Sequence, residues 1–144
     1  MNAPRIDQLN VVVGDVAAAA RFLVELGVDI PAVDADWGGH HRAVPVADGT
    51  TLDLDSGVFA QQWGRLDASF RGVVVNVRVD ERPDVDRLHE QALALGARSL
   101  KPPYDAFWGA RFATVEAPGE LVVGIMSASD EAHRGAPPDP ATLG

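Results

Sequence analysis

The chain of 144 residues contains no cysteine. This absence excludes disulfide bonds, thiolate nucleophiles and zinc sites built on cysteine. Aromatic residues make up only 6% of the chain, and no apolar run approaches the ~20 residues that a membrane-spanning helix needs. Residues 1–5 also lack the apolar core of a signal peptide, so we expect a cytoplasmic location.

Positive charge is scarce as well. Lys and Arg number 12 against 21 Asp and Glu, which gives a net charge of -9. A nucleic-acid partner is therefore not expected, because phosphate backbones bind to basic surfaces. The acidic surface has two interpretations that the sequence leaves open: it can attract a cationic ligand, or it can simply keep the protein soluble.

What the chain does contain is a repeated pattern. Asn10–Val13 recurs as Asn76–Val79, about 66 residues later. Each copy is followed by an Asp and then a Gly, Asp15 with Gly27 and Asp84 with Gly96, and the spacing from Asp to Gly is identical in the two copies. A strand, a capped amphipathic helix and a glycine that ends it indicate a duplicated βα unit, since one such unit cannot cover its own apolar face.

The apolar periods and turn signals predict the elements of two modules, at about 5–55 and 70–127. Strands are expected at 5–13, 30–35, 41–46, 50–55, 70–79, 99–100, 108–116 and 121–127, and helices at 15–26 and 84–95, with Asp15 and Asp84 as N-caps. Asp48-Gly49 is a hairpin turn signal, and Pro102-Pro103 cannot continue in a sheet interior.

These elements predict an α+β fold in which two βαβββ modules form a curved mixed β-sheet. We expect helices on the outer face and a central cleft within a single domain over residues 1–127. The connector 56–69 is interpreted as a short helix or a linking arm between the modules. The tail over 128–144, which holds three prolines, is predicted to be disordered.

Polar residues gather on one face of the expected strands. The opposite faces are apolar and should pack beneath the helices. The polar faces carry Gln8, Asn10, Thr51, Asp53, Asp55, Asn76 and Arg78. We expect them to line the cleft, although an exposed face of an antiparallel sheet would show the same pattern.

This arrangement resembles the vicinal oxygen chelate superfamily, which includes glyoxalase I, extradiol dioxygenases, epimerases and bleomycin resistance proteins. The resemblance covers about residues 5–127 and rests on Ile6–Asp15, Thr51–Asp55, Trp108–Arg111 and Ala117–Ile125. It implies a ligand-binding cleft between paired modules and a homodimer. Metal-using members take one ligand from the first and one from the last strand of each module, usually His or Gln, Glu, His and Glu.

Carried over by position, the metal sites implied by the resemblance are Gln8, Asp53, Val74 and Gly124. Val74 and Gly124 offer no side-chain lone pair, and one amide with one carboxylate is a weak site. We therefore expect no metal ion and no other cofactor. His40 and His41 are neighbours that would point to opposite faces of a strand, so only one of them can enter the cleft. His89 and His133 are interpreted as solvated.

Members of the bleomycin-resistance type hold drugs between aromatic walls without an ion. The resemblance therefore implies metal-independent binding of a small molecule, aromatic or cationic, for sequestration, resistance or sensing. The candidate ligand-binding residues are Gln8, Asn10, Trp37, His41, Asp53, Asp55, Asn76, Trp108 and Arg111. Asp53 or His41 would be a general base only if burial moved its pKa toward neutrality, and neither shows a partner in the sequence.

Two alternatives remain open. A purely structural interaction module would have its cleft filled by its own side chains. A metal-dependent lyase, isomerase or dioxygenase would need a rearranged site around Gln8, His41 and Asp53. The sequence does not decide whether the protein is an enzyme.

Overall fold

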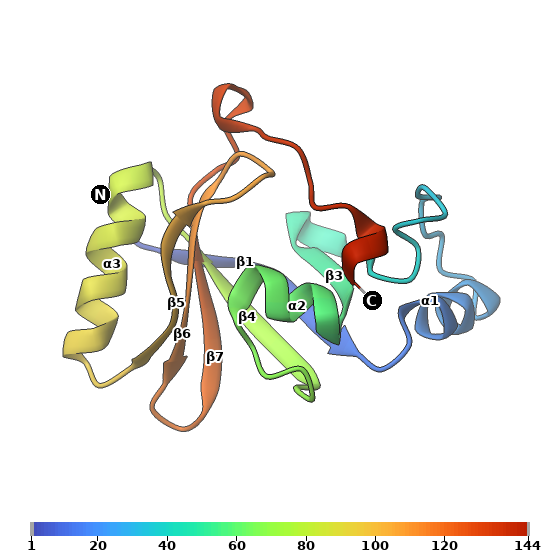
Figure 1. Ribbon diagram of the computed structural model, residues 1–144, viewed down its shortest axis with the longest axis horizontal. Coiled ribbons are helices and arrows are strands. Elements are labelled where there is room, and N and C mark those ends of the chain that lie inside the picture. The colour runs from blue at the N-terminus through green and yellow to red at the C-terminus, as the bar shows by residue number, and fades with distance from the viewer. Residues whose placement is uncertain (1, 144) are drawn as a thin grey trace. The chain divides into compact units, whose positions relative to one another are not determined.

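The computed structural model describes residues 2–143, which fall into two compact units (Figure 1). The N-terminal unit comprises Gln8–Val73 with Pro138–Gly144, and the C-terminal unit comprises Met1–Asp7 with Val74–Pro137. Each unit contains strands in both parallel and antiparallel pairs, with helices outside the sheet. The predicted α+β class with mixed β-structure is confirmed.

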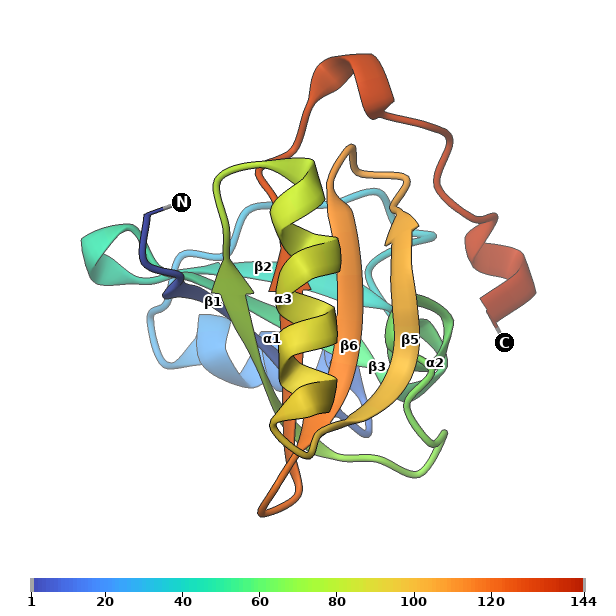
Figure 2. The same ribbon diagram turned by 90° about the vertical axis from the view of Figure 1, so that its left-hand side faces the viewer.

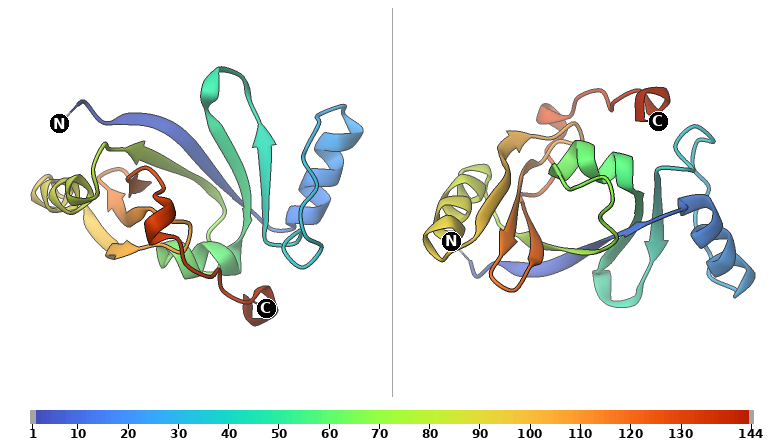
Figure 3. Two further views of the ribbon diagram at one scale, coloured as in Figure 1. Left: turned by 90° about the horizontal axis from the view of Figure 1, so that it is seen from above. Right: turned by 60° about the horizontal axis from the view of Figure 1, so that its bottom comes forward.

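The N-terminal unit follows the order strand, helix, strand, strand, helix. Its elements are β1 (Arg5–Val13, which belongs to this unit from Gln8 onward), α1 (Val16–Glu25), β2 (His41–Pro45), β3 (Thr51–Ser56) and α2 (Gly57–Gly64). The strands are ordered β2-β3-β1, with β1 parallel to β3 and β2 antiparallel to β3. Figure 3 shows the β2–β3 hairpin beside α1.

The helix α1 forms where the sequence predicts it. The Asp15 carboxylate accepts a hydrogen bond from Ala18 N at 2.9 Å, which caps the first turn, and Gly27 follows the helix at a positive φ of 104°. Val16 and Ala20 pack on the apolar face of β2 and β3, against Val44 and Leu54. This core leaves the opposite face of the sheet to the polar residues.

The C-terminal unit contains the second module. Its elements are β4 (Gly72–Arg78, which belongs to this unit from Val74 onward), α3 (Arg82–Ala94), β5 (Arg98–Asp105), β6 (Arg111–Ala117) and β7 (Leu121–Met126), ordered β4-β7-β6-β5 in the sheet. Figure 2 shows α3 in front of this sheet. Val85 of α3 packs against Val79, Ala113 and Ile125, so this unit also buries the helix-facing side of its strands.

Three local predictions are wrong. Residues 30–35 form no strand, because Pro31 has no amide hydrogen for a ladder and Asp34 begins a turn in which its carboxylate accepts from Asp36 N at 3.0 Å. The first module therefore has one strand fewer than expected. The second wrong prediction is Asp84 as the N-cap of α3. The N-cap is Glu81, and Asp84 lies in the first turn, where its carboxylate accepts from Glu81 N at 3.1 Å.

The third wrong prediction concerns the length of the strand near residues 99–100, which is present but extends further than expected. β5 continues through Pro102-Pro103 to Asp105, because it is the edge strand of its sheet and register shifts place the prolines between the pairs Lys101 with Thr114 and Tyr104 with Phe112. Prolines are tolerated at such edges and bulges.

Two connecting regions complete the chain. The connector 56–69 contains the helix α2, capped by Ser56 Oγ, which accepts from Phe59 N at 3.2 Å. In the tail, 3₁₀ turns span Glu131–His133 and Pro140–Leu143. Disorder of residues 128–144 in solution stays a prediction, as do the single domain over 1–127 and the central cleft. Within residues 2–143 there is no helix of sufficient length and apolarity to cross a membrane.

Candidate functional site

Five predicted site residues of the N-terminal unit lie on one face of its sheet, opposite α1. We call them the carboxylate–imidazole cluster: Gln8 and Asn10 on β1, His41 on β2, and Asp53 and Asp55 on β3. Asn10 is in register with Asp53, and His41 is in register with Asp55. Because side chains alternate along a strand, these five residues point to the same side.

A continuous chain of hydrogen bonds joins the cluster. Gln8 Nε2 lies 3.2 Å from Asp53 Oδ2 and 3.0 Å from Asn10 Oδ1, and donates to both. Asn10 Nδ2 donates to Asp55 Oδ2 at 2.6 Å, and His41 Nδ1 lies 2.6 Å from Asp55 Oδ1. Both oxygens of Asp55 therefore have a partner, which a buried carboxylate requires.

The three ionisable groups of the cluster differ in their surroundings. The Asp55 side chain is 1% exposed, and the His41 side chain is 36% exposed. Burial acts to lower the pKa of His41, but the hydrogen bond and charge of Asp55, with the charge of Asp53, outweigh it and raise the pKa above its usual value. Burial raises the pKa of Asp53 to about 6, although the charge of His41 opposes the rise.

Aromatic rings border the imidazole. The Phe59 ring of α2 lies 5.9 Å from the His41 ring and 5.1 Å from the Trp37 ring, in edge-to-face geometry. The neighbouring His40 turns to another partner, since its Nδ1 lies 2.9 Å from Ser56 Oγ. His41, and not His40, is thus the histidine on the polar face.

The turn signal at Asp48-Gly49 predicts a hairpin in which residues near 41 pair with residues near 55. It does not specify the register to one residue, so the pairing of His41 with Asp55 comes from the structure. The contact of Phe59 with His41 had no such signal, because it depends on where α2 begins.

The C-terminal unit places other residues at the corresponding positions. Asn76 is in register with Gly124, as Asn10 is with Asp53, so Val74 and Gly124 correspond to Gln8 and Asp53. Val74 and Asn76 are buried. A Cβ at Gly124 would collide with the Asn76 amide oxygen and come within 2.9 Å of the Phe112 ring, so this position has neither a side chain nor room for one.

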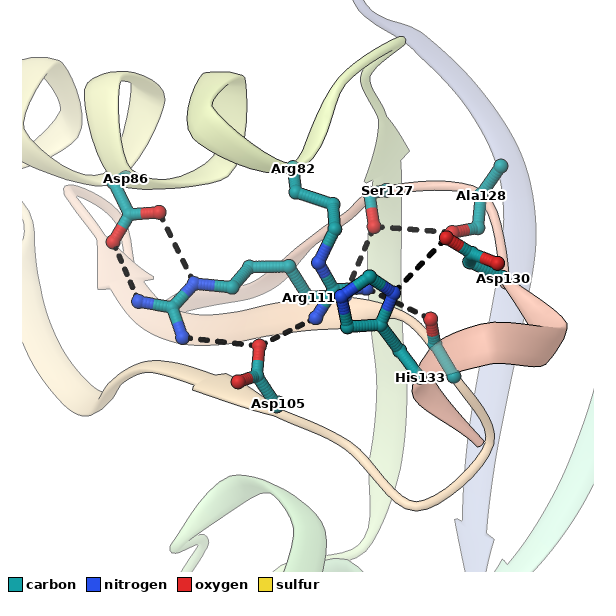
Figure 4. A network of polar contacts seen from close by, with 9 residues as sticks. Arg82, Asp86, Asp105, Arg111, Ser127, Ala128, Asp130 and His133 are labelled. Atoms are coloured by element: carbon teal, nitrogen blue, oxygen red, sulfur yellow. Dashed lines mark hydrogen bonds and ion pairs between the residues drawn. The ribbon is translucent and has the colours of Figure 1, made fainter. Parts of the chain in front are cut away.

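Two other predicted site residues belong to the C-terminal unit. The Trp108 ring packs edge-to-face against Phe107 at 5.2 Å and Phe112 at 5.4 Å. Arg111 points to carboxylates, with Nη2 2.8 Å from Asp86 Oδ1 and Nη1 3.2 Å from Asp105 Oδ1 (Figure 4). These ion pairs hold the guanidinium in place, and a ligand role for Arg111 or Trp108 stays a prediction.

The histidines outside the cluster have different surroundings. His89 was expected to be solvated, but it is buried and its Nε2 lies 2.8 Å from Ser99 Oγ, because α3 packs this position against β5. This prediction is wrong. His133 is exposed and lies near Asp130, as Figure 4 shows.

The residues at the four positions implied for a metal ion do not fit one. Gln8 and Asp53 hydrogen-bond to each other, whereas Val74 and Gly124 provide no donor atom. Among residues 2–143, no three His, Asp or Glu side chains are grouped so that they could hold an ion.

One family model matches most of the chain. The model of the Glyoxalase/Bleomycin resistance protein/Dioxygenase superfamily matches residues 5–125. A search of curated proteins finds no match.

Solved structures show the same fold. A superfamily member from Vibrio splendidus is 15% identical with a TM-score of 0.59, and the match covers 88% of this chain and 100% of that one. A Mn(II)-bound glyoxalase from Novosphingobium aromaticivorans is 17% identical with a TM-score of 0.58, covering 90% and 43%. A structure from Legionella pneumophila titled NAD-dependent benzaldehyde dehydrogenase is 16% identical with a TM-score of 0.61, covering 85% and 98%. At these identities the likeness concerns the fold alone.

Proposed function

Because the chain belongs to the Glyoxalase/Bleomycin resistance protein/Dioxygenase superfamily, we propose that it binds a small molecule without a resident metal ion. The observation that carries this proposal is Gly124. The position lacks a side chain, and its space is filled by Asn76 and Phe112. Together with Val74 it leaves the C-terminal unit with no donor at either implied ligand position.

The carboxylate–imidazole cluster supplies the polar contacts of the proposed site. His41 offers its second ring nitrogen, Nε2, because Nδ1 is bonded to Asp55. Hydrogen bonds to a charged group contribute about 1.5–3 kcal/mol each when water is excluded. The cluster therefore favours a ligand with an oxygen acceptor or a cationic group close to His41 and Asp53.

The rings of Trp37 and Phe59 favour an aromatic group on the same ligand. Each edge-to-face contact contributes about 0.5–1.5 kcal/mol beyond the burial of area. Trp37 is only half-buried, so part of its ring can meet a ligand. An aryl ketone such as phenylacetone combines the two features.

The first test is metal analysis of the purified protein after dialysis. We expect less than stoichiometric divalent metal, and a stoichiometric ion that survives dialysis would overturn metal independence. The alternative, a rearranged metal site around Gln8, His41 and Asp53, predicts in addition that Asp53→Ala abolishes both metal content and turnover.

The second test is calorimetric titration with phenylacetone. A ligand of this size is expected to bind with a Kd on the order of 0.1 mM. Trp37→Ala should weaken binding about tenfold, whereas Phe22→Ala, which removes an exposed ring from α1, should leave the Kd unchanged. Equal binding by the wild type and Trp37→Ala, or no heat at millimolar ligand, would contradict the assignment.

A further inference from the structure

We propose that His41 is a general acid–base residue that relays a proton through Nε2 on an aryl-substituted 1,3-dicarbonyl ligand, with Asp55 as its positioning residue. The proposal rests on the function proposed above, because it uses the same cluster. It adds a reaction, keto–enol tautomerisation, to binding.

Three observations define the geometry. Asp55 is buried and is fixed by Asn10, whose Nδ2 lies 2.6 Å from Asp55 Oδ2. The other carboxylate oxygen lies 2.6 Å from His41 Nδ1. The His41 side chain remains 36% exposed, so part of it is accessible from solvent.

The carboxylate determines which nitrogen can react. An ionised carboxylate only accepts hydrogen bonds, so the neutral imidazole carries its proton on Nδ1 and presents the lone pair of Nε2. Asp55 thus holds the imidazole of His41 in position as a base, and a positioned base contributes about 10²–10⁴-fold to a rate.

His41 alone can carry out both proton transfers of the reaction. Nε2 takes the proton from the carbon between the two carbonyl groups, and the electron pair of the broken C–H bond forms a C=C bond while a carbonyl π pair moves to its oxygen. The imidazolium then gives the same proton to that oxygen. The enol leaves, the neutral imidazole is regenerated, and no other reactant is consumed.

A 1,3-dicarbonyl is the class that suits an imidazole, because its central C–H bond is acidic enough for so weak a base. The Phe59 ring, 5.9 Å from His41, and the Trp37 ring beside it favour an aryl substituent. The compound 1-phenylbutane-1,3-dione has both features and serves as the probe.

The charged groups that face the ring set its dependence on pH. Among the described residues these are Asp55 and Asp53, both on β3, while Phe59 on α2 is uncharged. The carboxylates raise the pKa of His41 against the effect of burial. The base form should therefore appear only as the pH rises through a value above 6.5.

The experiment follows the tautomerisation of 1-phenylbutane-1,3-dione by ultraviolet absorption from pH 5.5 to 9. For the wild type we expect a rate above buffer that rises with pH. His41→Gln keeps a side-chain N–H for Asp55 and should lose about 10²–10⁴-fold in rate. The matched His133→Gln, on the exposed tail turn, should retain the full rate.

The Asp55→Asn variant distinguishes a role of Asp55 in positioning His41 from a purely structural role. Without the carboxylate, burial dominates and the pKa of His41 falls, so the midpoint of the pH profile should move to lower pH while kcat drops. A kcat loss with an unmoved midpoint would overturn the positioning role. A rate no faster than buffer, or an equal rate in His41→Gln, would overturn the reaction. Phenylacetone binding that persists in that case leaves the proposed binding function standing.

Discussion

In the N-terminal unit His41 faces Asp55 across the β2–β3 ladder, whereas the corresponding pair in the C-terminal unit, between β6 and β7, is Phe112 and Met126. Both pairs lie on the side of the sheet that faces away from the packed helix. The same register therefore holds a hydrogen-bonded histidine and carboxylate in one unit and two apolar side chains in the other.

The next position along the strands differs in the same way. Asn10 is paired with Asp53 in the N-terminal unit, and Asn76 is paired with Gly124 in the C-terminal unit. The amide is common to both units, but only one of them keeps an acid. The two units thus share the backbone pattern, whereas the ionisable groups at these positions occur in the N-terminal unit.

The largest expected effect comes from removing the buried acid. Asp55→Leu removes the buried carboxylate that accepts from Asn10 and lies 2.6 Å from His41 Nδ1, so we expect a loss of about 3–5 kcal/mol in the free energy of unfolding. Met126→Leu, at the corresponding position, should cost less than about 1.5 kcal/mol. Urea unfolding at pH 7 measures both, and similar losses would break the comparison between the units.

The second effect depends on pH. The pKa of Asp53 rises from 3.8 to about 6 on folding, so the stability gained from its protonated form is complete below pH 3.8 and is lost as the pH rises through 6. At pH 7.5 the cost reaches about 3 kcal/mol, since each pKa unit corresponds to about 1.4 kcal/mol.

Asp53→Asn removes this cost and can still accept from Gln8. We therefore expect the variant to be more stable than the wild type at pH 7.5 and equally stable at pH 4, in urea unfolding at both values. Asp29→Asn, at an exposed site, should show no such dependence on pH. A variant that is less stable at pH 7.5 would contradict the origin assigned to the raised pKa.

The smallest expected change in stability tests whether Gly124 has room for a side chain. Gly124→Ala adds a methyl group against Asn76 and Phe112 and should cost about 1–3 kcal/mol by overpacking. Gly135→Ala, where no atom lies within 4 Å of the added Cβ, should change stability by less than about 0.5 kcal/mol. Equal melting temperatures for the two variants would mean that Gly124 has room for a side chain.

The strand faces and helix ends of the N-terminal unit could largely be predicted from residue patterns. The alternation of Leu52 and Leu54 with Asp53 and Asp55 defines an apolar and a polar face before any contact is known. Asp15 and Gly27 mark the two ends of α1 because capping and the positive φ are local requirements. The strand expected at residues 30–35 does not form, because Pro31 has no amide hydrogen to donate to a ladder.

The pairing of His41 could not be predicted, because it depends on one residue of register. A two-residue turn at Asp48-Gly49 would place Arg42 opposite Asp55 and turn His41 to the apolar face. The actual connection contains a 3₁₀ turn at Ala47–Gly49 and pairs Pro45 with Thr51. That shift brings His41 to Asp55.

The sequence by itself determined which residue types can act: acids, amides and an imidazole in the first module, and valine and glycine at the corresponding places in the second. Composition and local propensity are properties of short segments, so they can be read without coordinates. The tertiary structure alone decided which of these groups touch, since hydrogen bonds between β1, β2 and β3 depend on ladder register and burial.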